Sequence, residues 1–248
     1  MQLTSSLPGA NQGIGLETAK NLLLDNEAYH VILGIRDLSK GEAAVQALSA
    51  LPDLKGTVSA IKLDVTDDES VDAAAAHVKS TYGRLDILVN NAGIFLRGNP
   101  REVGRKLFGT NVVGYLSVTE AFLPLLKEAP APRIVFVTSS LGSFTLASDP
   151  KSPLYAPLAN EYRAATAARN MLLNQYWVRL QIENPGLFKV HGADPGLVAT
   201  NLADSPDLLR KRGAVEPDVG GARIASVVKG DRDADVGRVC SEGNIVPW

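Results

Sequence analysis

The sequence predicts an α/β fold, with one doubly wound parallel sheet that carries helices on both of its faces. Two observations support this prediction. Short apolar runs alternate along the chain with longer amphipathic stretches, an order typical of parallel strands connected by helices. Within the runs, successive positions are apolar, whereas a strand with one solvent-facing side alternates apolar and polar residues. The predicted sheet is therefore covered on both faces.

The elements follow from these two patterns. The apolar runs predict strands at Tyr29–Ile35, Thr57–Leu63, Asp86–Val89, Arg133–Thr138 and Leu187–Gly192, with a short possible strand before them at Gln2–Leu7. The amphipathic stretches predict helices at Ile14–Asp25, Ser39–Leu51, Asp67–Tyr82, Gly104–Lys127 and Tyr162–Glu183. No internal repeat, low-complexity tract or linker interrupts this order, so we expect a single domain over residues 1–248.

Two segments depart from the alternation. Leu141–Leu158 is rich in Ser, Pro and Leu and predicts a loop, while Leu202–Val219 predicts a short helix between loops. Both follow predicted strands, so both should lie at the carboxyl edge of the sheet, where ligands bind in open α/β folds. Large side chains in these segments favour an apolar substrate, although side chains of this kind are as often simple packing: Phe144, Leu146, Leu154, Tyr155, Leu202 and Leu208.

Composition and charge exclude several classes of function. Hydrophobic residues make up 45% of the 248 residues and the net charge is −2, which leaves no electrostatic footprint for nucleic acid or an anionic membrane. The first residues lack the basic start and apolar stretch of a signal peptide, and no run approaches the length of a membrane span. We expect a cytoplasmic protein. The single cysteine, Cys240, has no cluster of metal ligands around it and predicts a buried thiol.

A glycine-rich turn precedes the first predicted helix. Glycine allows the backbone to turn tightly and to approach a pyrophosphate, and the helix N-terminus supplies N–H groups. A tight turn without a ligand would need the same residues, but placement at the start of an α/β chain favours dinucleotide binding. The residues that we predict to contact the cofactor here are Gly9, Asn11, Gln12, Gly13, Ile14 and Gly15.

These glycines, together with Asn90-Asn91-Ala92-Gly93 after the fourth predicted strand, resemble motifs of the short-chain dehydrogenase/reductase family. The resemblance covers nearly the whole chain. It implies a Rossmann-type fold, a nicotinamide cofactor, a small-molecule substrate, and assembly into a homodimer or homotetramer. Pro8 departs from the family motif, which has threonine there, so the turn lacks a hydroxyl and a backbone N–H.

Further cofactor contacts come from position and from the resemblance. Arg36 follows the second predicted strand, where an arginine can pair with the 2′-phosphate of NADP, so we expect NADP(H) rather than NAD(H); an exposed loop arginine is the alternative. The resemblance implies that Asp64 and Val65 border the adenine. It further implies that the nicotinamide half contacts Asn91, Ala92, Gly93, Tyr162, Pro195, Gly196, Val198 and Thr200.

The same resemblance implies a set of catalytic residues. Tyr162 would exchange a proton with the substrate oxygen, Ser140 would hydrogen-bond that oxygen, and Asn111 would help to hold a relay water. Tyr155 is the other tyrosine that follows Ser140 at a suitable interval. The proline two residues after Tyr155 breaks a helix interior, whereas the residues after Tyr162 match the family helix. We therefore predict Tyr162.

Thr166 is where the family has its active-site lysine, four residues after the tyrosine. That lysine binds the nicotinamide ribose and lowers the pKa of the tyrosine, and a positive charge at such a distance is worth roughly 3–4 kcal/mol. Threonine supplies no charge. Arg169 lies on the same helical face as Tyr162 and Thr166. It would either reach back toward the site or serve as an ordinary surface or interface arginine, and we expect the latter.

Three functions are consistent with these residues. The first is an NADPH-dependent reductase of a carbonyl or imine on a small, apolar organic substrate, with Tyr162 as general acid and Thr166 in the place of the lysine. The second is a non-redox enzyme, such as a cyclase or isomerase, on the same scaffold. The third is a catalytically silent NADP-binding protein. The presence of Asn111, Ser140 and Tyr162 favours the first two, because a binding protein does not need them.

Overall fold

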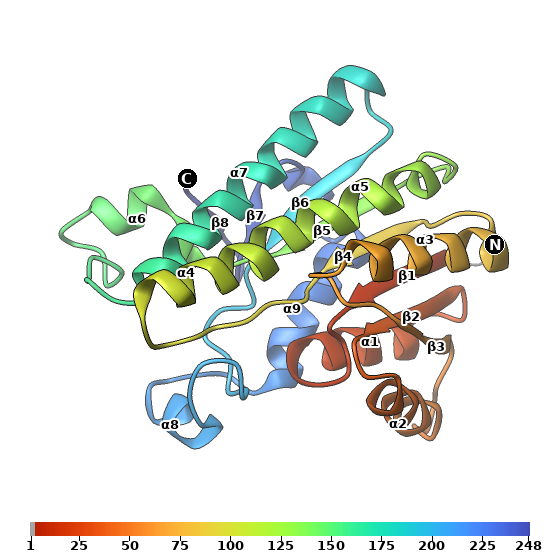
Figure 1. Cartoon of the computed structure of the whole chain (residues 1–248), viewed down its shortest axis with the longest axis horizontal. Coiled ribbons are helices and arrows are strands. Elements are labelled where there is room, and N and C mark those ends of the chain that lie inside the picture. Colours follow the sequence, from red (N-terminus) through yellow and green to blue (C-terminus); the bar gives the residue numbers. More distant parts are fainter. Residues whose placement is uncertain (1–2) are drawn as a thin grey trace.

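A computed structural model describes residues 3–248 and shows one eight-stranded sheet between two layers of helices (Figure 1). The sheet order is β3-β2-β1-β4-β5-β6-β7-β8; all neighbours are parallel except β7 and β8. The chain thus winds outward in both directions from β1 and β4, and the predicted doubly wound sheet is confirmed. The strands are β1 (Leu3–Pro8), β2 (Tyr29–Ile35), β3 (Thr57–Lys62), β4 (Ile87–Asn90), β5 (Arg133–Val137), β6 (Lys189–Ala193), β7 (Val239–Cys240) and β8 (Ile245–Val246).

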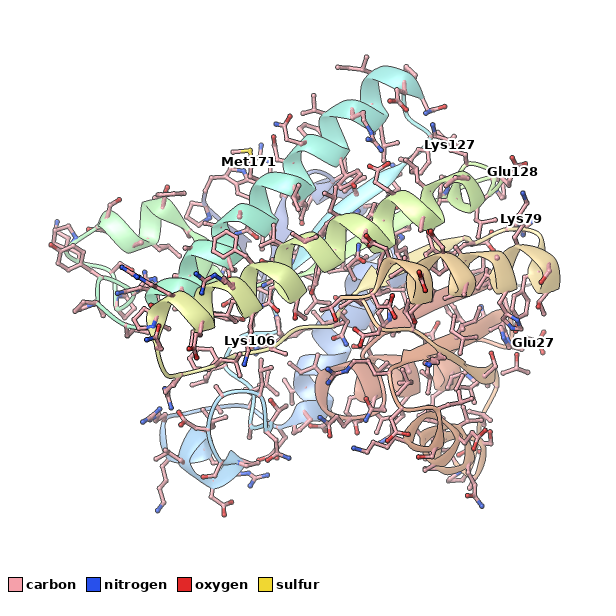
Figure 2. All side chains as sticks on the ribbon, viewed as in Figure 1. Glu27, Lys79, Lys106, Lys127, Glu128 and Met171 are labelled. Carbon is pink, nitrogen blue, oxygen red and sulfur yellow. The ribbon has the colours of Figure 1, made fainter. Side chains whose placement is uncertain are left out.

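The helices divide between the two faces of the sheet. Apolar side chains of α3, α5 and α7 form one core with the sheet, and those of α1, α2 and α9 form the other. The helices are α1 (Gly13–Asp25), α2 (Leu38–Ser49), α3 (Asp68–Tyr82), α4 (Pro100–Phe108), α5 (Gly114–Leu126), α6 (Phe144–Ser148), α7 (Asn160–Glu183), α8 (Pro206–Lys211) and α9 (Pro217–Lys229). The outer face of α7 is open to solvent, as Met171 shows in Figure 2.

The helix predicted at Gly104–Lys127 is two helices joined by a π-helical turn. The first, α4, begins one turn earlier than predicted, because Asn99 caps it by accepting a hydrogen bond from the Arg101 N–H. The turn, Gly109–Val113, separates α4 from α5 and contains Asn111. Single π-helical turns of this kind are common at functional sites, since they redirect a side chain within a continuous helix.

The first strand is unusually polar but fully integrated into the sheet. Thr4, Ser5 and Ser6 are buried, and β1 pairs with β2 on one side and β4 on the other. The Thr4 N–H donates to Oδ2 of the buried Asp86 at 2.9 Å. The prediction placed this strand at Gln2–Leu7; Gln2 lies outside the described residues.

The segments predicted to flank a substrate carry short helices. Leu141–Leu158, predicted as a loop, contains the last part of a 3-10 turn at Ser140–Gly142 and the helix α6, while Leu202–Val219 contains α8 as predicted and the start of α9. Ser143 and Thr145, at the start of α6, donate hydrogen bonds to carbonyl oxygens of Pro247 and Trp248. No helix within residues 3–248 is long and apolar enough to cross a membrane. Cys240 is buried in β7, as predicted.

Candidate active site

The glycine turn and the segment after β4 are held together by Asn91. Its Nδ2 donates to the carbonyl oxygens of Pro8 and Gly9, at 3.1 and 3.2 Å. Gly9 has φ +75°, and a Cβ there would lie 2.9 Å from the Cα of Ala92. A Cβ at Gly15 would lie 2.5 Å from Asn91 Nδ2. The turn therefore accepts only glycine at these two positions, and its backbone lies directly against Asn91 and Ala92.

The start of α1 is left open for an anion. Gln12 is the N-cap residue, and its side chain makes no capping hydrogen bond, so no side chain at the cap accepts from the first N–H groups of the helix. Gly13, with φ +58°, begins the helix, and a Cβ there would lie 3.5 Å from Cγ2 of Thr200. Ile14 is half-buried and packs against the core under α1. The glycine turn and the segment after β6 thus converge on a helix N-terminus, which fits a pyrophosphate.

Asn111 fixes the residues just after the Asn-Asn-Ala-Gly segment. Its Oδ1 accepts from the Ile94 N–H at 2.9 Å, and its Nδ2 donates to the Ile94 carbonyl at 2.8 Å. The side chain is fully buried. Both ends of the amide are therefore occupied by the protein backbone, so a relay water would have to be held by other atoms of this turn.

Tyr162 lies in the first turn of α7, at the far end of the same segment. Its ring packs against Phe95, with the ring centroids 5.1 Å apart, and against the small apolar cluster that contains Val103 and Leu107 of α4. The side chain is half-buried. Tyr155, the alternative, lies in the loop before α7 with 57% of its surface exposed. The structure therefore brings Tyr162, rather than Tyr155, onto the helix.

The predicted serine is linked to the Pro-Gly turn through a buried aspartate. Asp194 accepts from the Ser140 N–H with Oδ2 and from the Gly196 N–H with Oδ1, both at 2.8 Å. The Ser139 hydroxyl accepts from the Leu141 N–H at 3.2 Å, whereas the Ser140 hydroxyl has no partner within residues 3–248. Both serines are half-buried, and an accepting hydroxyl still has its own proton to donate. Either could serve a substrate oxygen.

Comparison with known proteins shows the family to which the chain belongs. The family model described as short chain dehydrogenase matches residues 7–207. The chain belongs to the short-chain dehydrogenase family. It is 38% identical to the short-chain dehydrogenase/reductase tropE of Talaromyces stipitatus, over 97% of this chain and 96% of that protein.

Solved structures of two oxidoreductases share the fold. An alcohol dehydrogenase from the archaeon Thermococcus sibiricus, complexed with 5-hydroxy-NADP, has a TM-score of 0.75 at 24% identity and covers 98% of this chain and 96% of its own. A 3-oxoacyl-[acyl-carrier protein] reductase from Brucella melitensis, in complex with NAD, has a TM-score of 0.78 at 21% identity and covers 97% and 95%. At these identities the likeness concerns the fold.

Thr166 lies one turn after Tyr162 in α7. It is fully buried, and its hydroxyl donates to the Tyr162 carbonyl at 2.7 Å, as threonine often does inside helices. A Cβ at Gly142 would lie 2.8 Å from Thr166 Cγ2. The Thr166 side chain therefore packs against the turn after β5, and its place in the catalytic set stays a prediction.

Arg169 is not the surface or interface residue that we expected. Only 3% of it is exposed, and its guanidinium carbon lies 5.0 Å from the ring centroid of Tyr115 on α5. The expectation was wrong because it rested on charge alone, whereas the ring of Tyr115 offers a buried surface that accepts a cation. The contact between Arg169 and Tyr115 was not predicted, because the two residues lie far apart in the sequence.

The residues predicted for the adenosine half lie at the carboxyl ends of β2 and β3. Arg36 is exposed directly after β2 and makes no hydrogen bond or ion pair with any described residue. Asp64 Oδ1 accepts from the Thr66 N–H and hydroxyl at 2.9 and 2.7 Å. Val65 is buried, and its carbonyl oxygen would lie 2.9 Å from a Cβ at Gly114. Arg36 is thus free to bind an anion.

The two predicted substrate segments are each tied to the site by an arginine. Arg163, next to Tyr162, donates to the carbonyls of Leu154 and Ala156, both at 2.8 Å. Arg97 stacks over Phe95 and forms an ion pair with Asp204, at 2.7 Å. The Arg97 guanidinium, which is hydrogen-bonded to Asp204, lowers the pKa of that carboxyl. Both segments therefore reach the neighbourhood of Phe95 and Tyr162.

Val198 lies in the segment after β6, where the sequence predicts a contact with the nicotinamide half of the cofactor. It is buried and bridges to Val215 beside α9, where a Cβ at Gly220 would lie 2.8 Å from Val198 Cγ2. Arg223 of α9 donates to the Pro195 carbonyl at 2.9 Å and pairs with Glu242 at 2.5 Å. The Pro195–Gly196 turn is therefore held from both sides, by Asp194 and by α9.

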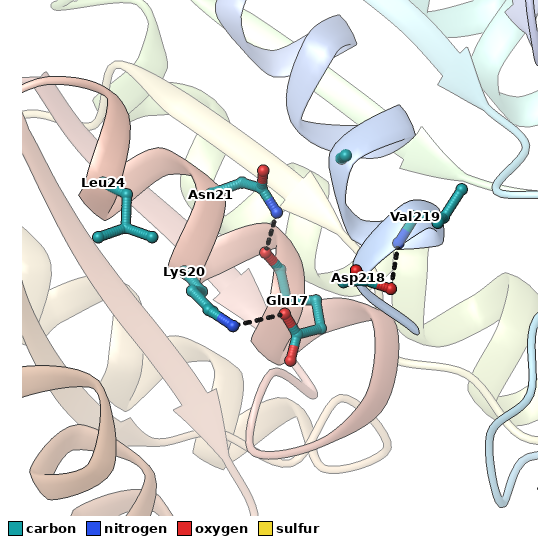
Figure 3. A pocket seen from close by; sticks show the side chains of 7 residues that line it. Glu17, Lys20, Asn21, Leu24, Asp218 and Val219 are labelled. Atoms are coloured by element: carbon teal, nitrogen blue, oxygen red, sulfur yellow. Dashed lines mark hydrogen bonds and ion pairs between the residues drawn. The ribbon is translucent and has the colours of Figure 1, made fainter. Parts of the chain in front are cut away.

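Two hollows in the surface lie outside the predicted catalytic residues. One, of about 410 Å³, lies between α1 and α9 and is lined by Glu17, Lys20 and Asp218 among others (Figure 3). The other, of about 260 Å³, lies below the Pro-Gly turn, beside Asp194 and Cys240. Neither contains Tyr162. No cluster of His, Cys, Asp and Glu among the described residues could hold a metal ion.

Proposed function

We propose that this protein is an NADPH-dependent reductase of a carbonyl or imine group on a small, apolar organic substrate, with Tyr162 as general acid. One observation carries the proposal. A single five-residue segment, Asn91–Phe95, touches the glycine turn at one end and Tyr162 at the other. Asn111 holds that segment at Ile94. The dinucleotide-binding turn and the phenol are therefore built against one common support.

The residues at the carboxyl edge fit a dinucleotide. Gly9 and Gly15 leave the backbone of the turn accessible, and the uncapped start of α1 favours the negative charge of a pyrophosphate. Arg36 would pair with a 2′-phosphate, and Asp64 and Val65 would border the adenine. Asn91, Ala92, Gly93, Pro195, Gly196, Val198 and Thr200 would border the nicotinamide half. When bound, NADPH supplies the hydride.

The protein's own groups supply the proton and the orientation. The Tyr162 hydroxyl would donate its proton to the substrate oxygen or nitrogen as the hydride reaches the adjoining carbon, and the Ser140 hydroxyl would hydrogen-bond the same atom. Reduction starts from the protonated phenol, whereas oxidation first needs the phenolate. Because Thr166 brings no cation to the site, the direction favoured is reduction.

The substrate class follows from the two tied segments. Several large apolar side chains are exposed there and none of them belongs to the main cores: Phe144, Tyr155, Leu158, Leu202 and Leu208. Phe95 adds an aromatic ring beside Tyr162. We infer a bulky, apolar carbonyl or imine compound, which such a surface would bind by burying apolar area.

The test is NADPH consumption with a panel of apolar ketones, aldehydes and cyclic imines, followed by near-ultraviolet absorbance. We expect turnover with NADPH, slower turnover with NADH, and its loss in Tyr162→Phe. Calorimetry on the same protein measures cofactor binding separately. Well-folded protein that binds neither NADP(H) nor NAD(H) would contradict the proposal.

A non-redox enzyme is the second candidate, and the closed position of Thr166 favours it. Without a lysine on the ribose, the site could use Tyr162 and Ser140 for cyclisation or isomerisation, with the dinucleotide as a scaffold. Product formation without NADPH consumption would identify it. Tight NADP binding without any product would instead indicate a silent binding protein.

We also propose self-association as a homodimer or homotetramer of a cytoplasmic protein. Large apolar side chains are exposed on the outer faces of the π-helical turn, α5 and α7: Val113, Leu116, Met171, Val178 and Ile182. A second copy that covered them would remove this apolar area from water. Light scattering after size-exclusion chromatography measures the assembly, and a monomer at micromolar concentration would contradict it.

A further inference from the structure

Arg169 is a buried cation without an anionic partner. It is 3% exposed, its Nε is buried without a hydrogen-bond acceptor, and no carboxylate pairs with it within residues 3–248. Removing a charge from water is costly unless the charge is paired. An unpaired guanidinium in this place therefore needs another explanation than surface solubility or an ordinary ion pair.

Tyr115 is the group that receives the guanidinium. The centroid of its ring lies 5.0 Å from the Arg169 guanidinium carbon, and its hydroxyl donates to the Val137 carbonyl at 3.1 Å. That carbonyl belongs to the last residue of β5, two residues before Ser139. Burial raises the pKa of Tyr115, and the Arg169 guanidinium opposes that rise. The ring that receives the cation is thus hydrogen-bonded to the end of β5, just before the candidate serines.

Arg169 also shares a helix face with two residues of the candidate site. It lies three residues after Thr166 and seven after Tyr162, so the three side chains share one face of α7. Long side chains in helices point toward the helix N-terminus, here toward Thr166 and Tyr162. Thr166 itself is sealed, with its hydroxyl on the Tyr162 carbonyl and its methyl group against Gly142. The inner face of α7 below Tyr162 therefore carries one positive charge, and it comes from position 169.

We propose that the interior beside positions 166 and 169 of α7 can hold only one positively charged side chain, and that Arg169, packed on the Tyr115 ring, is that side chain. Its charge supports proton donation by Tyr162. Arg169 would act as a positioning residue, because it reaches the phenol through the field in a buried site rather than by contact with substrate. The second half of the proposal rests on the proposed reductase function. The first half concerns folding and is independent of it.

The first test is a double-mutant cycle on the stability of the full chain, measured by urea unfolding. Thr166→Lys puts a second cation beside Arg169, and Arg169→Leu removes the first. We expect Thr166→Lys to lower the folding equilibrium constant at least about tenfold more in the wild-type background than in the Arg169→Leu background. A smaller difference would overturn the shared site.

A matched control separates charge from size. Thr166→Met has a long side chain without charge, so its cost should depend less on Arg169 than that of Thr166→Lys. Equal or greater coupling for methionine would overturn the proposal. If Thr166→Lys alone does not fold, circular dichroism of Thr166→Lys/Arg169→Leu decides, because a folded double variant supports the shared site and an unfolded one contradicts it.

The second test separates charge from shape in catalysis. Arg169→Lys keeps the positive charge, and Arg169→Met keeps much of the length without it. We expect Arg169→Met to lower kcat about tenfold or more with little change in KM for NADPH, and Arg169→Lys to retain most of kcat. An unchanged kcat in Arg169→Met would overturn the catalytic role. If the wild-type protein consumes no NADPH with any substrate, the proposed function fails, and the folding cycle still decides the shared site.

Discussion

The Asn111 side chain hydrogen-bonds both backbone groups of Ile94: it accepts from the N–H at 2.9 Å and donates to the carbonyl at 2.8 Å. The π-helical turn at Gly109–Val113 aims the side chain at this point. Ile94 lies between the segment that contacts the glycine turn and Phe95, which packs on Tyr162. A single buried amide therefore sets the spacing between the predicted cofactor site and the predicted acid.

Removing this amide should loosen the site and the fold together. Asn111→Ala removes both hydrogen bonds from the half-buried Ile94 backbone, so we expect a loss of about 2–4 kcal/mol in the free energy of unfolding. Urea denaturation measures it. Asn174→Ala on α7 is the control, because within residues 3–248 its amide accepts a hydrogen bond from the neighbouring Gln175 alone, and we expect a change within about 0.5 kcal/mol. Equal losses in the two variants would contradict the role of Asn111.

The choice of tyrosine has a direct kinetic test. Tyr162→Phe removes the proposed proton donor and keeps the ring packing on Phe95, so the rate of NADPH consumption should fall by about 10²–10⁴-fold while cofactor affinity is retained. Tyr155→Phe should leave both unchanged. The reverse result would move the acid to the loop before α7.

The two serines can be distinguished by a paired substitution. Ser140→Ala removes a hydroxyl that has no partner among residues 3–248, so we expect turnover to fall by about 10²-fold or more at little cost in stability. Ser139→Ala removes the cap on the turn and should cost about 1 kcal/mol of stability, with a smaller effect on rate. Steady-state kinetics and urea unfolding of both variants provide the comparison. A larger kinetic loss in Ser139→Ala would make Ser139 the substrate partner.

Arg36 should determine the preference between the two nicotinamide cofactors. It is exposed after β2 and unpaired among the described residues, so Arg36→Ala should lose the interaction with a 2′-phosphate at little structural cost. We expect NADPH affinity to fall by about 10–100-fold with NADH affinity unchanged, measured by calorimetry. The neighbouring Asp37 must be kept, because its side chain caps α2. Equal losses for both cofactors would contradict this assignment.

His191 should make the protein less stable in mild acid. It is fully buried in β6, with Nε2 3.6 Å from Asp233 Oδ1, and neither ring nitrogen has a hydrogen bond with any described residue. Burial, reinforced by Arg133, lowers the pKa of His191 to about 4, although Asp233 opposes the change. An unfolded histidine has a pKa of about 6.5, so below that pH the unfolded chain binds a proton that the folded chain refuses until about pH 4.

The expected loss is roughly 3 kcal/mol in the free energy of unfolding between pH 6.5 and pH 4, with no contribution above pH 6.5. His191→Phe removes this titration and keeps the Arg133–Asp233 ion pair, so its stability should depend less on pH in this window. Urea unfolding at several pH values measures both proteins. Parallel pH dependences would show that another group is responsible.

Much of the fold follows from local pattern, because strands buried on both faces are nearly continuous apolar runs. Tyr29–Ile35 is predicted with its observed bounds for this reason. The strands β7 and β8 have two residues each, too few for any pattern to register, and they exist only through pairing with β6 and each other. The π-helical turn is likewise invisible in sequence, since it keeps the apolar spacing of the helices on either side.

The site is predictable where the backbone dictates the residue. Gly9 and Gly15 are required by close contacts, and Asn91 by the carbonyls it binds, so these residues can be found by motif. The environments of Thr166 and Arg169 depend on Gly142 and Tyr115, which come from other parts of the chain. Composition and spacing say nothing about such partners, which is why Arg169 was expected on the surface.

The hydrogen bonds from Arg163 to the loop before α7 bear on how the substrate specificity of this protein can change. The carbonyls of Leu154 and Ala156 accept hydrogen bonds from Arg163, the residue next to Tyr162. The loop that would select substrates is therefore fixed to the helix turn that carries the proposed acid. A chimaera that replaced the loop alone would lose the hydrogen bonds that Arg163 donates to it. Diversification along this lineage should therefore proceed by point changes within the tethered stretch, or by transplanting it together with the opening turn of the helix.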